Sequence, residues 1–139
     1  MARDRHFLVT GATGFLGQYL VRFLSRQPQC KVWAVSRNGG RVADVLVEGV
    51  DLSSAEEVRA WRETKPMFET VFHLAAVVPA SFHGIELEPF FTRNIVITHN
   101  VLSLAVRHQA ALVYASSSSV YGAASRSPAH IPLSEETLP

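Results

Sequence analysis

The sequence alternates short apolar runs with longer segments in which apolar residues recur every three or four positions. The runs are typical of buried strands, and the longer period is typical of amphipathic helices. We expect strands at residues 6–10, 31–35, 44–47, 70–74 and 111–115, and helices at 15–26, from the serines at 53 and 54 to just before Pro66, and at 88–108. Since the strands are apolar throughout and separated by helices, the pattern predicts an α/β fold. Its centre would be a doubly wound parallel sheet of about five strands, covered on both faces.

Local signals set some of the boundaries. Ser53 and Ser54 each precede a glutamate by three residues, a spacing that favours a helix start. Only about eight residues connect the second and third strands, too few for a crossover helix, so we expect a loop or a single turn there. Residues 123–139 hold three prolines and show no periodicity. We therefore divide the chain into a folded domain at 1–122 and an irregular tail at 123–139.

Composition narrows the class of protein further. The chain has 139 residues, of which 47% are hydrophobic and 18% charged, as in a single globular domain with a core. A formal charge of +1 without a basic stripe argues against nucleic acid as the partner. No apolar run approaches the roughly 18 residues of a membrane span, and we predict no metal site. The single cysteine, Cys30, and a start without a signal pattern fit a cytoplasmic protein.

A glycine-rich segment directly follows the first predicted strand and opens the first predicted helix. It reads Gly11-Ala-Thr-Gly14-Phe-Leu-Gly17. Gly11 allows a sharp turn, Gly14 lets the backbone approach a pyrophosphate, and Gly17 lets the helix pack closely on the strand. The helix N-terminus would then offer free N–H groups to the phosphates. We assign the whole loop, with Thr13, Phe15 and Leu16, to cofactor binding; the alternative is a glycine-rich turn without a ligand.

Two further strand ends carry candidate nucleotide contacts. Ser36 and Arg37 follow the second strand, with Arg41 nearby, where an acid would bind the ribose hydroxyls of NAD. An arginine suits a 2′-phosphate instead, which favours NADP, although NAD stays open and the arginine could simply be solvated. After the third strand, the Asp51 carboxylate could accept from an adenine amino group while Leu52 covers the ring. Asp51 could equally be a helix N-cap or a turn residue.

Small and polar residues mark the last two strand ends. His73 precedes Leu74, Ala75 and Ala76, small enough for the backbone to approach a cofactor. We interpret His73 as a packed, hydrogen-bonded histidine rather than a catalyst. Asn94 is a poor helix former inside the long helix, which a side chain bridging to a neighbouring loop would explain; otherwise it is a surface residue. Ser116 to Ser119 follow the last strand, either at the ligand or as a flexible serine-rich loop.

Together these motifs resemble the extended short-chain dehydrogenase/reductase family, in its nucleotide-sugar epimerase and dehydratase branch. The resemblance rests on the glycine loop at 11–17, Asp51-Leu52, His73-Leu-Ala-Ala76, Asn94 with Thr98 and Asn100-Val-Leu102, and Tyr114-Ala-Ser-Ser-Ser-Ser-Val-Tyr-Gly122. It implies a Rossmann-like domain that binds NAD(P), and oxidation or reduction at a carbon of a nucleotide sugar. By resemblance Ser117 is the catalytic serine. Ala115 and Ser116 would line the nicotinamide side of the cofactor site, and Ser118 and Tyr121 would border the substrate.

The chain departs from the family at one essential point. The family's chemistry requires a Tyr-x-x-x-Lys pair, in which the tyrosine moves the proton and the lysine lowers its pKa. None of the three tyrosines has a lysine four residues later, and the lysines are Lys31 and Lys65. The end of the chain, residues 131–139, resembles the stretch just before that pair. We therefore expect the catalytic helix, the last strands and the substrate domain to be missing.

Two interpretations follow. In the first, the chain is the cofactor-binding portion of an NADP-dependent nucleotide-sugar epimerase, dehydratase or reductase, inactive alone. In the second, it is a stand-alone nucleotide-binding or interaction module that has lost catalysis. The absent pair fits both, whereas Ser117 and the intact glycine loop favour the first. In either case an open sheet edge would be covered by a homodimer or by another partner.

Overall fold

The computed structural model describes residues 4–79, 86–117 and 120–121. Its elements in chain order are β1 (Arg5–Thr10), α1 (Phe15–Ser25), β2 (Cys30–Ser36), β3 (Gly40–Val42), β4 (Val45–Gly49), α2 (Ala55–Glu63), β5 (Thr70–His73), α3 (Glu88–His108) and β6 (Ala111–Tyr114). All predicted strands and helices are present, within about two residues of their expected ends. The predicted tail at 123–139 lies outside the described residues.

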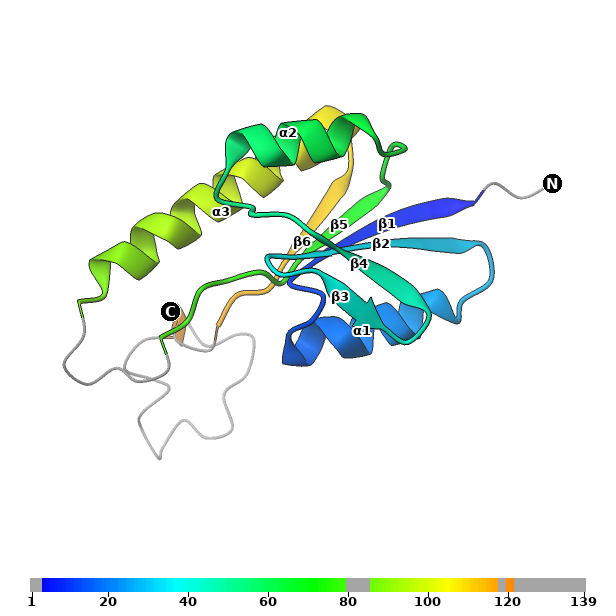
Figure 1. Cartoon of the computed structure of the whole chain (residues 1–139), viewed down its shortest axis with the longest axis horizontal. Coiled ribbons are helices and arrows are strands. Elements are labelled where there is room, and N and C mark those ends of the chain that lie inside the picture. Colours follow the sequence, from blue (N-terminus) through cyan, green and yellow to red (C-terminus); the bar gives the residue numbers. More distant parts are fainter. Residues whose placement is uncertain (1–3, 80–85, 118–119, 122–139) are drawn as a thin grey trace.

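The strands form one six-stranded sheet in the order β3-β4-β2-β1-β5-β6. The pairs β1–β2, β1–β5, β2–β4 and β5–β6 are all parallel. The chain therefore runs outward from β1 in both directions, as in a doubly wound sheet. In Figure 1, α1 lies on one face of this sheet, and α2 and α3 lie on the other. The predicted Rossmann-like α/β fold is confirmed.

One element was not anticipated. The connection between β2 and β4, expected as a loop or single turn, contains β3, which pairs antiparallel with β4. The hairpin turns at Ala43, whose φ of 50° is left-handed, and its other end begins at Gly39 and Gly40, with φ of 63° and 135°. Two adjacent glycines indicate a loop in a sequence. Here they supply the backbone angles that bring a three-residue edge strand back onto the sheet.

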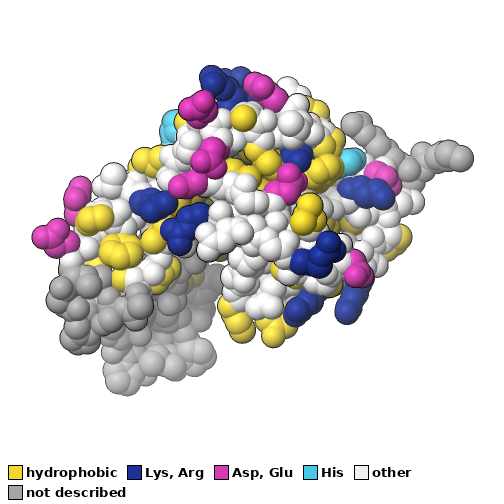
Figure 2. All heavy atoms as spheres, viewed as in Figure 1, with side chains coloured by type: hydrophobic (Ala, Val, Ile, Leu, Met, Phe, Trp, Pro, Cys, Tyr) yellow, Lys and Arg dark blue, Asp and Glu magenta, His cyan; other side chains and the backbone are white. Residues whose placement is uncertain are grey.

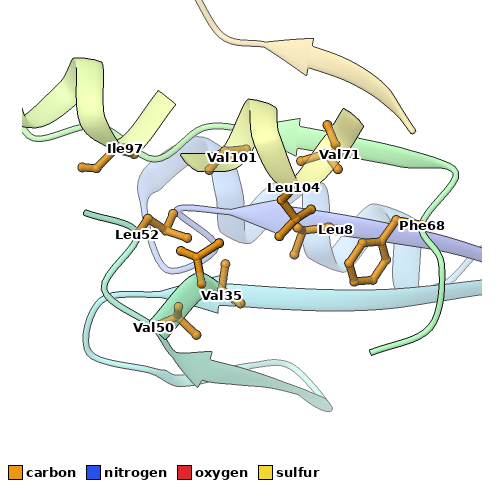
Figure 3. Close-up of a cluster of buried hydrophobic side chains, with 11 residues drawn as sticks. Leu8, Val35, Val50, Leu52, Phe68, Val71, Ile97, Val101 and Leu104 are labelled. Atoms are coloured by element: carbon orange, nitrogen blue, oxygen red, sulfur yellow. The ribbon is translucent and has the colours of Figure 1, made fainter. Parts of the chain in front are cut away.

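Hydrophobic side chains are buried on both faces of the sheet, because successive side chains of a strand point to opposite sides. Leu8, Val35 and Val71 face α2 and α3, where they pack with residues of those helices such as Val101 (Figure 3). Phe7, Val9 and Ala34 face α1, where Val21 and Leu24 cover them. Two-sided burial explains why these strands are apolar throughout rather than alternating.

The start of α2 confirms the helix signal at Ser53 and Ser54. Ser54 is the N-cap, and its hydroxyl accepts a hydrogen bond from the Glu57 N–H at 3.2 Å. The Glu57 carboxylate accepts from the backbone N–H of Asp51 at 2.9 Å rather than from Ser54. These two hydrogen bonds thus link the first turn of α2 to the segment between β4 and α2.

Candidate functional site

A pocket of about 390 Å³ lies at the carboxyl ends of β1, β2, β4 and β5. Parallel strands bring these ends to one edge of the sheet, which is where open α/β sheets bind their ligands. The residues that line it are Gly11, Thr13, Gly14, Ser36, Arg37, Asn38, Val50, Asp51, Leu52, Leu74, Ala75, Ala76, Val77, Val78, Arg93 and Ile97. Most of the residues predicted to bind the cofactor are therefore gathered in one place. A second hollow of about 360 Å³ lies between α2 and α3, and none of the predicted site residues lines it.

The glycine loop is shaped by close backbone contacts. Gly11 has a left-handed φ of 65°, and a Cβ there would lie 2.8 Å from the Ala75 backbone nitrogen. A Cβ on Gly17 would overlap the Gly11 carbonyl oxygen. Gly11 and Gly17 are therefore required by the fold itself, at the turn and at the contact between α1 and β1. Gly14 is the least constrained of the three, since its Cβ would meet just the Gly11 carbonyl oxygen, although closely, at 3.1 Å.

The N-terminus of α1 fits a bound phosphate. Gly14 is the N-cap, no side chain of the described residues caps the helix, and no acidic residue lies in its first turn. The first N–H groups of a helix have no acceptor within it, and the helix dipole adds partial positive charge. These donors border the pocket at Gly14, so the residues present match what a pyrophosphate requires.

The side chains of Phe15 and Leu16 lie outside the pocket. They are 80% and 57% exposed, and Gly17 is buried in the helix. The structure places these three residues in the first turn of α1, so any contact with a phosphate would come from their backbone N–H groups rather than from their side chains.

A buried network under the pocket involves His73. Its Nδ1 lies 2.8 Å from the hydroxyl of Thr10, and its Nε2 lies 3.3 Å from that of Thr98. The Thr10 oxygen also accepts from the N–H groups of Leu74 and Ala75, both at 3.2 Å. Both of its lone pairs are then used, so the Thr10 hydroxyl donates to Nδ1 and the ring proton sits on Nε2. Burial lowers the pKa of His73, which keeps the ring neutral. The interpretation of His73 as a structural, hydrogen-bonded histidine is confirmed.

Two asparagines of α3 anchor the loops that border the pocket. The Asn94 side chain accepts from the Val77 N–H at 2.7 Å and donates to the Val77 carbonyl at 2.9 Å. The predicted bridge from Asn94 to a neighbouring loop is confirmed. Asn100, which is buried, donates to the Leu52 carbonyl at 3.0 Å. Each amide side chain thus fixes a loop that follows a strand. Asn94 is not itself among the residues that line the pocket.

Asp51 is held at the pocket by several groups. Its Oδ1 accepts from the N–H and the hydroxyl of Ser53, at 2.9 and 2.6 Å, and its Oδ2 pairs with Arg93 at 3.2 Å. The hydrogen bonds from Ser53, and more weakly the charges of Arg93 and Arg37, lower the pKa of Asp51 against the opposing effect of burial. Asp51 therefore caps a local turn through Oδ1 and also faces the pocket. The alternative of a turn residue is confirmed, and the contact with an adenine amino group stays a prediction.

The basic residues after β2 differ in position. Arg37 lines the pocket, whereas Arg41 is exposed on β3, and its guanidinium donates to the Asp44 carbonyl at 3.4 Å. Ser36 is buried, and its hydroxyl donates to the Gly39 carbonyl at 3.2 Å. Arg37 is thus the arginine of this segment that lines the pocket.

The residues after β6 lie beside the pocket rather than in its lining. The Ala115 N–H donates to the His73 carbonyl at 3.1 Å, and Ala115, Ser116 and Ser117 are exposed. The Ser117 carbonyl accepts from the Val120 N–H at 3.1 Å, and Tyr121 follows in a short turn. Ser118 lies outside the described residues. The structure therefore separates the predicted catalytic segment from the predicted nucleotide pocket.

Several lining residues were not predicted. They are Asn38, Val50, Val77, Val78, Arg93 and Ile97. Asn38 and Val50 adjoin predicted residues, so their place follows from proximity. Arg93 and Ile97 are four residues apart on α3 and therefore lie on the same side of the helix. That spacing was visible in the sequence, but which side of α3 faces the strand ends was not.

The fold and the pocket define a Rossmann-like α/β domain with a glycine-rich loop at the N-terminus of its first helix. The chain belongs to the NAD dependent epimerase/dehydratase family, whose model matches residues 7–139. It is 30% identical over 122 residues to UDP-glucuronic acid decarboxylase 6 from Arabidopsis thaliana. It is also 30% identical to a solved UDP-galactose 4-epimerase, with a TM-score of 0.74 over 96% of this chain. The UDP-glucose 4-epimerase of Bifidobacterium longum, solved with NAD+ and UDP, shares the fold with a TM-score of 0.75 over 95% of this chain at 20% identity.

The chain spans only part of these proteins. The 122 matched residues are 86% of this chain and 35% of the decarboxylase. The chain covers 44% of the UDP-galactose 4-epimerase and 42% of the Bifidobacterium enzyme. The relationship therefore concerns the nucleotide-binding fold first, and the activities of the whole relatives do not transfer by similarity alone.

Other kinds of site find no support in the described residues. Among them no group of three or more His, Cys, Asp or Glu side chains is placed to hold a metal ion. No helix in the described ranges is both long and apolar enough to cross a membrane. Basic and acidic side chains are interspersed on the face shown in Figure 2.

Proposed function

We propose that the chain binds NAD(P) in the pocket at the strand ends, with a preference for NADP. The observation that carries this proposal is the uncapped N-terminus of α1, which opens onto the pocket through the glycine loop. A dinucleotide needs donors for its two phosphates at one end and a cover for its adenine at the other. The pocket offers both, since Gly14 lines it together with Asp51 and Leu52.

Each part of the dinucleotide is then bound by particular residues. The pyrophosphate lies at the N–H groups of the first turn of α1, where Gly14 lets it approach. The adenine packs on Leu52, and its amino group donates to Asp51. Arg37 holds the 2′-phosphate. Leu74, Ala75 and Ala76 allow the cofactor to run along the end of β5 toward the segment after β6, where Ala115 and Ser116 border its nicotinamide half.

We further propose that the chain is part of a nucleotide-sugar epimerase, dehydratase or reductase. The sugar-nucleotide enzymes among its relatives support this class of substrate. When bound, the cofactor supplies a hydride acceptor for a sugar carbon. Ser117 follows β6, next to the end of β5, and hydrogen-bonds the reacting oxygen of the sugar. Ser118 and Tyr121 border the sugar.

We propose that the 139-residue chain does not turn over a nucleotide sugar by itself. Proton transfer needs a group with a pKa near the working pH, and the hydroxyl of Ser117 is far too weak an acid to serve unaided. No tyrosine in the sequence has a lysine four residues later. Incubation with NADP+ and a panel of UDP-sugars, followed at 340 nm and by product analysis, should show no turnover. Turnover abolished by Tyr121→Phe would contradict this proposal, because the chain would then use its own tyrosine.

The preference for NADP is tested by calorimetry with Arg37→Ala. A charge-assisted hydrogen bond is worth roughly 1.5–3 kcal/mol, or about 10- to 100-fold in affinity. We expect the variant to lose NADP+ affinity by such a factor and to keep its NAD+ affinity. Arg41→Ala removes the same charge from outside the pocket and should bind like the wild type. A wild-type chain that prefers NAD+ would overturn the cofactor preference and leave the binding site standing.

A further inference from the structure

Arg93 is a basic residue that lines the pocket, although it lies far along the sequence from the residues it contacts. It lies on α3, 42 residues after Asp51, and its side chain is 38% exposed. Its terminal Nη2 lies 3.2 Å from Asp51 Oδ2 and 3.5 Å from the Ser53 hydroxyl. In the described part of the chain its buried Nε has no hydrogen-bond partner. The guanidinium is therefore directed at Asp51 and its turn.

These contacts use most of the acceptor capacity of Asp51. A carboxylate has about four lone-pair positions, two on each oxygen. The N–H and the hydroxyl of Ser53 occupy both positions on Oδ1, and Arg93 occupies one on Oδ2. One position on Oδ2 is left, and Asp51 and Leu52 both line the pocket. The site is thus built to receive a single N–H donor from a ligand.

The arginine also sets which donor is accepted. With Ser53 fixing one oxygen and Arg93 the other, the carboxylate cannot rotate to present a different edge. The charges of Arg93 and Arg37 favour its ionised form, which is a pure acceptor. A ligand group that is itself an acceptor would face the carboxylate oxygen without a hydrogen bond between them, an arrangement that costs affinity. In a 6-oxo purine the N1–H donor is displaced from the 6-position, so the base would have to shift in the pocket to bring it to Asp51.

We propose that Arg93 is a positioning residue that makes the pocket selective for a purine with a 6-amino group, adenine, over one with a 6-oxo group. This inference rests on the proposed binding of a dinucleotide and adds to it the residue that orients Asp51. Arg93 acts through Asp51 and does not itself need to touch the base. Ile97, one turn along α3, lines the same end of the pocket and adds apolar cover.

The test compares dinucleotides that differ only at the base. NADP+ and NAD+ are titrated by calorimetry against their analogues with hypoxanthine in place of adenine. The wild-type chain should bind the adenine forms about 10-fold more tightly, since the 6-oxo group leaves a polar pair unsatisfied. In Arg93→Met this preference should fall below about threefold, and in Arg93→Lys, which keeps the charge but not the fork, it should be intermediate. Arg107→Met, an exposed arginine further along α3, is the matched control and should keep the wild-type preference.

Asp51→Asn completes a double-mutant cycle. Its amide can turn an N–H toward a 6-oxo group, so it should bind the hypoxanthine forms relatively better, and adding Arg93→Met should then change little. A merely structural role for Arg93 would weaken all four nucleotides equally and keep the base preference. That result, in Arg93→Met or in Arg93→Lys should the former fail to fold, would overturn the role of Arg93 alone. A wild-type chain that binds none of the four nucleotides would overturn the proposed function, and this inference with it.

Discussion

At the scale of single residues, the hydroxyl of Thr10 organises the floor of the pocket. It is fully buried at the end of β1 and bonds to His73 and to the two N–H groups that follow β5. The backbone of Leu74 and Ala75 is thereby held where it leaves the sheet, next to Gly11. The neutral form of His73 is part of this arrangement, because its Nδ1 must accept.

This network predicts a loss of stability in mild acid. Burial lowers the pKa of His73, and burial together with the charge of Arg62 lowers that of His108, whose Nδ1 accepts from the Phe68 N–H at 3.1 Å. The unfolded chain takes up these protons near pH 6.5 and the folded chain does not. Stability is therefore complete above about pH 6.5 and falls as the pH drops toward the folded pKa values, by up to about 1.4 kcal/mol per pH unit for each histidine.

Urea unfolding between pH 5 and pH 8 measures this effect. His73→Gln and His108→Gln should each flatten the dependence on pH, whatever they do to the stability at pH 8. A free energy of unfolding that is constant from pH 8 to pH 5 would contradict the neutral, acceptor role of both buried rings.

At the scale of elements, α1 and α3 serve the pocket in different ways. α1 presents backbone donors and packs on β1 without any side chain between Gly17 and the Gly11 carbonyl. α3 instead sends the side chains of Arg93, Asn94 and Asn100 to the loops after β4 and β5. On one side, the pocket is therefore fixed by the close packing of α1 on the end of β1. On the other side, it is fixed by hydrogen bonds from polar side chains of α3.

The close contact at Gly17 predicts an effect opposite to helix propensity. Alanine in place of glycine inside a helix ordinarily adds about 0.5–1 kcal/mol of stability. At Gly17 the new methyl group would overlap the Gly11 carbonyl, so α1 must shift, and such overpacking costs about 1–3 kcal/mol. We expect Gly17→Ala to lower the free energy of unfolding by urea. Gly49→Ala, whose Cβ would meet only ordinary contacts, should change it by less than about 0.5 kcal/mol; a more stable Gly17→Ala would contradict the close packing.

The features that could be predicted from the sequence are those with local signals. The glycine loop, the cap at Ser54 and the bridging role of Asn94 each follow from a residue type in a short context. β3 was missed because two glycines look like a loop until a neighbouring strand provides the edge. Arg93 was missed because its meaning depends on Asp51, 42 residues away, and on which face of α3 meets the strand ends. Long-range pairing of this kind leaves no local pattern.

At the scale of the whole molecule, the described residues form a Rossmann-like sheet with an exposed edge at β6. β6 is the last strand of the sheet, and its Val113 and Tyr114 are 48% and 56% exposed. The predicted homodimer or partner at this edge stays a prediction. By contrast, the lining residues that the structure describes run from Gly11, after β1, to Ile97 in α3, so the binding of a dinucleotide can be measured on this chain.

The central claim, that a dinucleotide binds at the N-terminus of α1, is tested most directly by Gly14→Val. Gly14 lines the pocket at the N-terminus of α1, so the valine side chain would take up room beside the proposed phosphate donors, whereas Ala60→Val adds two methyl groups at an exposed position of α2 outside the pocket lining. Calorimetry with NADP+ should give a loss of at least about 10-fold in affinity, or about 1.4 kcal/mol, for Gly14→Val. Ala60→Val should bind like the wild type, and matching far-UV spectra would establish that both variants fold. Equal affinity of Gly14→Val and the wild type would contradict the claim.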